Sequence, residues 1–146
     1  MTAWMVVGLI GLAGGVAAGV QGPLAAVMGR QVGIMGSVFI IHLGGTIAAG
    51  CLLFVPRAAE LSRWRAVPWY ALSAGVLGLV LVGAFTYCVP RIGAASTMTL
   101  IICTQLIVGS LLDHFGLLVE QARSFDLRRM AGVGVLLLGT WLVVRR

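Results

Sequence analysis

Charged residues are scarce in this sequence, and lysine is missing altogether. Only 10% of the 146 residues are charged, four residues are acidic, and all ten basic residues are arginines. Roughly a quarter of the residues of a soluble domain are charged, so this chain lacks the polar residues needed to cover a water-facing globule. The arginines stand singly or in small groups between apolar stretches, which argues against a nucleic-acid-binding surface despite the net charge of +6.

Cysteines are equally few, and they do not suggest cross-links. Cys51, Cys88 and Cys103 are odd in number, and each lies within or at the end of an apolar run, which excludes a disulfide scaffold. The sequence also has no paired metal ligands, no nucleophile beside a base and no phosphate-binding loop. We therefore expect neither an enzyme nor a bound cofactor or metal.

Apolar residues make up 60% of the chain, with a mean hydropathy of +1.09. A helix that spans a membrane needs about 20 such residues, so five helices and short loops use up the whole length. The predicted fold is an all-α integral membrane protein with one five-helix transmembrane domain over residues 1–146. The helices are expected at about 4–27, 33–55, 68–89, 92–112 and 130–144, with an interfacial segment over 113–129.

Prolines and polar residues give the expected helix ends. Pro23 should loosen the end of the first helix, and Arg30-Gln31 is expected to form the first loop. Pro90 is expected to end the third helix, and Asp113 the fourth. Within the first helix, Gly11, Gly15 and Gly19 recur every four residues, which predicts a groove where another helix packs closely.

The arginines also bear on orientation in the membrane. With five helices, the loops and termini carry six arginines on one side and four on the other. Orientation follows this balance in short loops, so we expect insertion in both orientations or with a slight preference. Transporters often pair two inverted repeats, and no second copy is evident in this sequence. A second molecule would supply it, giving an antiparallel homodimer with its substrate site between the subunits.

Several short elements occur together from Pro68 onward. They are Pro68-Trp69-Tyr70, Pro90-Arg91-Ile92-Gly93, Gln105 with Ser110, Asp113-His114-Phe115-Gly116 and Arg128-Arg129. With these elements the chain resembles the YdcZ family, a five-helix branch of the drug/metabolite transporter superfamily. It differs from the family's pattern at Ala25-Ala26, where an Asn is usual, and at Ile41-His42, where Ser-Phe is usual.

The resemblance implies a multi-pass protein of the bacterial inner membrane that exports small molecules. It also implies a likeness to the small multidrug resistance and EamA-type transporters, which work by alternating access. The partner would be a second copy of the chain or a close paralogue, within the lipid bilayer. No substrate follows from the resemblance.

Amide and hydroxyl side chains at membrane depth are costly and are therefore candidate functional groups. Gln105 lies near the middle of its helix with Gly109 one turn on, and we predict that it lines a cavity with Thr104 and Ser110. For the hydroxyls, the alternative is a bond to the carbonyl of the preceding turn. Gln21 precedes Gly22-Pro23, where a loosened helix could bind substrate; alternatively, it bonds a neighbouring helix.

Two histidines are candidates for proton coupling. His42 lies near the middle of the second helix, and an imidazole can take up and release a proton near neutral pH. Alternatively, His42 is neutral and bonded to a backbone carbonyl. Asp113 and His114 form the one adjacent acid–histidine pair. They form either a gate or a proton-coupling pair, or Asp113 caps the next segment.

The sequence places no Asp or Glu at the centre of a helix, which argues against an exchanger with a central carboxylate. The leading hypothesis is a small-molecule exporter that works as an antiparallel dimer. The alternatives are a structural or accessory membrane protein, in which the glycines only pack helices, and a protein that moves lipids along a polar groove.

Overall fold

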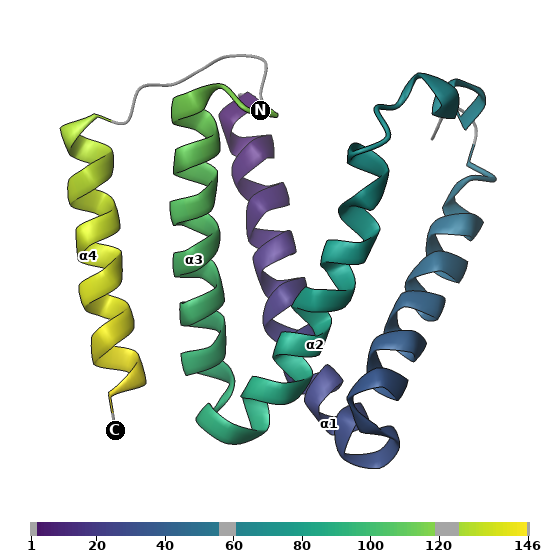
Figure 1. Cartoon of the computed structure of the whole chain (residues 1–146), viewed down its shortest axis with the longest axis horizontal. Helices are drawn as coiled ribbons and strands as arrows, with labels where there is room; N and C mark the ends of the chain where they lie inside the picture. Colours follow the sequence, from purple (N-terminus) through teal and green to yellow (C-terminus); the bar gives the residue numbers. More distant parts are fainter. Residues whose placement is uncertain (1–2, 56–60, 119–125, 146) are drawn as a thin grey trace. The chain divides into compact units, whose positions relative to one another are not determined.

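The computed structural model describes residues 3–55, 61–118 and 126–145, and in these ranges the chain is helical with short connections. The elements are α1 (Ala3–Leu52), the short 3₁₀ helices η1 (Leu61–Ala66) and η2 (Ala71–Ser73), α2 (Ala74–Ile92), α3 (Ala94–Phe115) and α4 (Leu127–Val144). The chain divides into two compact units, Met1–Pro90 and Arg91–Arg146. Figure 1 shows the order of the helices along the chain.

Most large apolar side chains are exposed, including Trp4, Phe54 and Trp69. Trp4–Leu52, Ala71–Ile92 and Ala94–Phe115 are long and apolar enough to cross a membrane, and Met130–Val144 is a shorter apolar helix. Apolar helices with this much exposed apolar surface fit a bilayer, which confirms the predicted class. The predicted count of five treats α1 as two spans and α4 as one short span.

α1 holds two helical arms that meet at Gly33. This glycine has φ 75° and ψ 169°, and the chain reverses direction there (Figure 1). The prediction of a loop at Arg30-Gln31 is wrong, because both residues are helical. A positive φ takes the chain out of the helix at one residue, and glycine adopts it without a steric penalty.

α2 differs from its predicted range of 68–89 at both ends. It begins at Ala74 after η2, and it includes Pro90 before ending at Ile92. Pro23 likewise lies inside α1. A proline removes one backbone hydrogen bond but its φ suits a helix, so neither proline ends the element that contains it. α2 ends before Gly93, which has φ 82° and ψ 161°.

The corners at Gly33 and Gly93 are alike. Their backbone angles nearly coincide, and the side chain four residues later is fully buried in both cases, Ser37 at the first corner and Thr97 at the second. Buried residues also precede the two glycines at equal distances: Gly22, Ala25 and Ala26 before the first, and Val82, Phe85 and Thr86 before the second. The burial pattern is thus repeated although the residue types differ.

α3 extends past its predicted end at Leu112. Asp113 and His114 lie in its last turn, so the prediction that Asp113 ends the helix is wrong. The segment that Asp113 would cap lies largely outside the described residues, and the capping role stays a prediction. The helix ends at Gly116, which has a left-handed conformation with φ 63°, and its N–H donates to the Asp113 carbonyl at 3.3 Å. A glycine in this conformation is a frequent helix C-terminus.

α4 begins at Leu127, three residues before its predicted start. Its 18 residues are about 27 Å long at 1.5 Å per residue, so it nearly matches the thickness of a bilayer core. Of the predicted interfacial segment, residues 119–125 lie outside the described residues, as do Arg57 and Glu60 of the second predicted loop.

The two arms of α1 meet each other and α2 around the hydroxyl groups of Ser37 and Thr86. The Ser37 Oγ donates to the Ala25 carbonyl at 3.0 Å and lies 3.4 Å from the Thr86 Oγ1. Thr86 in turn donates to the Val82 carbonyl at 2.9 Å. A Cβ on Gly29 would overlap the Thr86 Cγ2, so α2 approaches the first arm as closely as a glycine permits.

Candidate functional site

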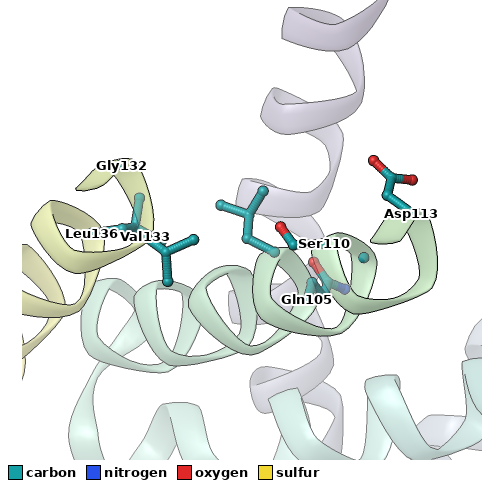
Figure 2. Close-up of a pocket in the computed structure, with 8 residues that line it drawn as sticks. Gln105, Ser110, Asp113, Gly132, Val133 and Leu136 are labelled. Atoms are coloured by element: carbon teal, nitrogen blue, oxygen red, sulfur yellow. The ribbon is translucent and has the colours of Figure 1, made fainter. Parts of the chain in front are cut away.

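A cavity of about 450 Å³ lies between α3 and α4, within the second unit. Figure 2 shows the polar side chains of Gln105, Ser110 and Asp113 on α3 and the apolar side chains of Val133 and Leu136 on α4. The lining residues are Gln105, Leu106, Gly109, Ser110 and Asp113 of α3, and Gly132, Val133 and Leu136 of α4. Ligand pockets for small molecules range from about 300 to 1,000 Å³, so the cavity has the size of a small-molecule site.

The polar side of the cavity follows from spacing along α3. Gln105, Gly109 and Asp113 recur every four residues and therefore share one face of the helix, with Ser110 beside them. Eight residues separate Gln105 from Asp113, which is about 12 Å along the axis at 1.5 Å per residue. Gln105 is midway along α3 and Asp113 is in its last turn. Polar groups therefore extend from the helix centre to its end.

Two glycines provide the space. A Cβ added to Gly109 or Gly132 would meet no atom within 4 Å, so both helices leave room at the cavity. The remaining wall is apolar and comes from Leu106, Val133 and Leu136. An apolar wall facing a few polar groups is typical of small-molecule sites.

Asp113 is the single ionisable side chain among the eight lining residues. It is half-buried, as is Ser110, whereas Gln105 is exposed. Among the arginines whose side chains the structure describes, none lines the cavity. The structure thus brings together three of the predicted site residues: Gln105, Ser110 and Asp113.

Thr104 and His114 lie outside this cavity, although both are on α3. The Thr104 Oγ1 donates to the Leu100 carbonyl at 2.9 Å, which is the alternative foreseen for the hydroxyls. His114 is exposed, and its ring meets that of Phe115 edge to face with centroids 5.1 Å apart.

Gln21 and His42 belong to the other unit. Gln21 is exposed beside the buried Gly22. The His42 Nδ1 lies 2.8 Å from the Val38 carbonyl, a contact that matches the alternative of a histidine bonded to the backbone. Its Nε2 faces Gly78 of α2, where a Cβ would lie 3.2 Å away. The absence of a side chain at Gly78 leaves room for the imidazole.

The glycines of the predicted packing groove are open. A Cβ at Gly11, Gly15 or Gly19 would meet no atom within 4 Å in the part of the chain that the structure describes. Close packing along this groove remains a prediction.

Sequence reasoning identified only the α3 half of the cavity. Val133 and Leu136 gave no separate signal, because aliphatic residues in an apolar helix resemble any lipid-facing stretch. Gly132 belongs to the family resemblance, but nothing in the sequence marked it as lining a cavity. The expected start of this helix at residue 130 also put Gly132 in its first turn. The start at Leu127 leaves Gly132 in the second turn, opposite α3.

Comparison with known proteins gives two matches. The sequence model of a family described as "Putative inner membrane exporter, YdcZ" matches residues 6–142. The inner membrane protein YdcZ of Escherichia coli (strain K12) is 34% identical over 84 residues, which cover 55% of this chain and 53% of that protein. The match thus spans about half the length of the relative. No solved structure matches the chain significantly.

Proposed function

From the premise that this chain belongs to the YdcZ family, whose sequence model matches residues 6–142, we propose that it exports small molecules across the bacterial inner membrane. It is an inner membrane protein with several apolar helices long enough to span the bilayer. The observation that carries the proposal is the cavity between α3 and α4. Its polar groups extend about 12 Å along α3, from Asp113 at the helix end to Gln105 at mid-helix.

Placing the polar groups of this cavity within a membrane costs free energy. Side chains such as Gln105 and Asp113 favour a bundle interior or a water-filled cavity over lipid. Gly109 and Gly132 add space beside them, which tight helix packing alone would not require. A substrate site accounts for both the polar groups and the space.

We propose that export works by alternating access in an antiparallel homodimer. The small difference in arginine number between the two predicted sides supports insertion in both orientations. Each subunit then contributes one α3–α4 cavity to a substrate site between the subunits. A close paralogue is the alternative partner, and co-purification of two differently tagged copies of this chain distinguishes the two.

We further propose that export is coupled to protons. The contact with the Val38 carbonyl fixes one ring nitrogen of His42 and leaves Nε2 toward Gly78, where it could accept a proton. Asp113 and His114, in the last turn of α3, are the proposed gate. Flux driven by an imposed pH gradient should disappear in His42→Gln, and an unchanged gradient dependence would refute this role.

A flux assay tests the exporter proposal. Purified protein is reconstituted in liposomes loaded with ethidium, radiolabelled sucrose or carboxyfluorescein, which represent a cation, a neutral solute and an anion. At least one solute should leave faster than from empty liposomes. In Gln105→Leu that flux should fall about tenfold, since a hydrogen bond to a charged or polar ligand is worth about 1.5 kcal/mol.

Thr104→Val is the matched control, because Thr104 is adjacent in sequence but lies outside the cavity. Its flux should equal that of the wild type. If all three solutes behave as in empty liposomes, the exporter proposal fails. If Gln105→Leu transports at the wild-type rate, the assignment of the cavity fails.

A further inference from the structure

We infer that the connection between α1 and α2 is an amphipathic anchor that lies in the membrane interface and binds anionic phospholipids. Residues 61–70, the anchor segment, contain η1 and end directly before η2. α1 on one side and the stretch Ala71–Ile92 on the other are long and apolar enough to cross a membrane, and the chain is an inner membrane protein. The anchor segment therefore lies between two points where the chain crosses the membrane surface.

Joining two helices does not by itself require such a segment in this protein. The two arms of α1 are joined at Gly33 alone, and α2 is joined to α3 at Gly93 alone. The connection between α1 and α2 is much longer, and its anchor segment carries exposed aromatic and basic side chains and no glycine. Turns and loops favour glycine and small polar residues instead. This composition indicates a role beyond reversing the chain.

The 3₁₀ geometry of η1 gives the anchor segment a continuous apolar face. Side chains three residues apart eclipse one another in a 3₁₀ helix, so Leu61 and Trp64 lie on one face. Val67 continues this face, because its N–H donates to the Trp64 carbonyl at 3.1 Å. The three side chains are 60%, 56% and 41% exposed, respectively. Their removal from water is favourable, and the bilayer interface next to the two spans provides the place for it.

The charge of the connection is complementary to an anionic membrane surface. Residues 53–73 contain three arginines and one glutamate, a net charge of +2 whichever ion pairs form among them. The guanidinium carbon of Arg65 lies 5.6 Å from the centroid of the Trp64 ring, which is within the range of a cation–π interaction. An arginine held beside an interfacial indole is at the level of the head groups, and its planar fork of N–H donors suits a phosphate.

A second pair of rings marks the end of the anchor segment. Trp69 is 83% exposed, and its ring meets that of Tyr70 edge to face with centroids 6.2 Å apart. The Ala71 N–H donates to the Pro68 carbonyl at 3.0 Å, so a hydrogen-bonded turn holds both rings directly before the span begins. Tryptophan and tyrosine are enriched at the boundary between membrane and water. An amphipathic segment with such rings and arginines is typical of chains that lie in the interface plane.

The test uses the full-length protein with Trp64 as its one tryptophan, made by Trp4→Phe, Trp69→Phe and Trp141→Phe. The three replaced rings are exposed, so their loss removes little packing. The protein is placed in nanodiscs of equal parts phosphatidylglycerol and phosphatidylcholine. One lipid or the other carries brominated acyl chains, which quench the fluorescence of a tryptophan that they touch, and the quenching gives the relative affinity of the two lipids at Trp64.

Phosphatidylglycerol should be preferred about fivefold, the ratio expected for one arginine at an anionic membrane surface. Raising the salt concentration to about 0.5 M should remove most of this preference, because salt screens charges near the surface. If the protein with three substitutions does not fold, the difference in quenching between the wild type and Trp64→Phe measures the same ratio.

Two arginine variants separate the anchor segment from the rest of the molecule. Arg65→Gln should lower the preference for phosphatidylglycerol several-fold. Arg145→Gln is the matched control, because the Arg145 guanidinium also lies over an indole ring, that of Trp141 at 4.7 Å, but at the end of α4. This control should leave the lipid preference at Trp64 unchanged.

Equal quenching by the two brominated lipids would overturn the inference, and so would an unchanged lipid preference in Arg65→Gln. Quenching of Trp64 by water-soluble acrylamide and by neither lipid would place the anchor segment in water, which would also overturn the inference. Each of these outcomes is independent of export, which the liposome assay measures separately.

Discussion

Glycine serves opposite purposes in the two units of the molecule. In the first unit, the space beside Gly29 is filled by the Thr86 methyl group. In the second unit, Gly109 and Gly132 face a cavity. The same residue type therefore brings helices together in one unit and holds a space open in the other. A glycine between apolar helices therefore indicates function only where the structure shows that the space beside it is open and belongs to a cavity.

The hydroxyls of Ser37 and Thr86 contrast with that of Ser110 in the same way. In the first unit, Ser37 and Thr86 are buried and each donates its hydrogen to a backbone carbonyl. In the second unit, Ser110 lines the cavity with Gln105 and Asp113. The first arrangement stabilises the fold and leaves no donor for a ligand, whereas the second presents polar groups to a space of ligand size.

The largest effect on stability is expected at Gly29, where the Thr86 methyl group fills the space beside the glycine. Gly29→Ala should destabilise the protein by about 1–3 kcal/mol, the usual cost of overpacking, because the new Cβ overlaps the Thr86 Cγ2. Thr86→Ser removes that methyl group, so it should recover most of the loss in the double variant. Denaturant unfolding in detergent measures both. Additive losses in the double variant would contradict this packing.

The next effect is on transport, in the unit where the space is open. Gly132→Leu should reduce flux about tenfold, equivalent to about 1.4 kcal/mol, while its free energy of unfolding stays within about 0.5 kcal/mol of the wild type. Gly134 is also open but does not line the cavity, so Gly134→Leu should change neither the flux nor the free energy of unfolding. A Gly132→Leu protein that is strongly destabilised would mean that this glycine packs helices, and the contrast between the units would be lost.

The smallest effect is expected from single hydroxyls. Ser37→Ala removes the donor to the Ala25 carbonyl and should cost about 0.6–1 kcal/mol, as measured for hydrogen bonds between membrane helices. The comparison is Ser96→Ala, whose hydroxyl donates to the Val143 carbonyl at a longer 3.4 Å in a less buried position. Its cost should be smaller. Equal losses in unfolding experiments would show that burial does not distinguish the two bonds.

The sequence predicted the helices better than their ends. Runs of apolar residues located the membrane-spanning stretches because a bilayer requires them. Pro23 and Pro90 were interpreted as disruptions, yet both lie inside helices. The actual corners are Gly33 and Gly93. Sequence alone cannot separate a glycine that adopts a positive φ from the many in this chain that remain helical.

The sequence predicted the α3 half of the candidate site but not the α4 half. Gln105, Ser110 and Asp113 stood out because polar side chains are rare in an apolar helix, and their spacing placed them near one another. Thr104 and His114 stood out for the same reason but lie outside the cavity. The α4 half could not be predicted, because contact between two helices depends on their packing and not on the composition of either.

Composition alone determined that this chain belongs in a membrane, since so few charges cannot keep such an apolar chain in water. The residues of α3 alone also determined which helix carries polar groups from its centre to its end. Only the tertiary structure decided beside which glycines another side chain fills the space and beside which the space is open. The reason is that a glycine's surroundings come from a distant segment, and neither the position of Thr86 beside Gly29 nor that of Gly132 opposite α3 is encoded locally.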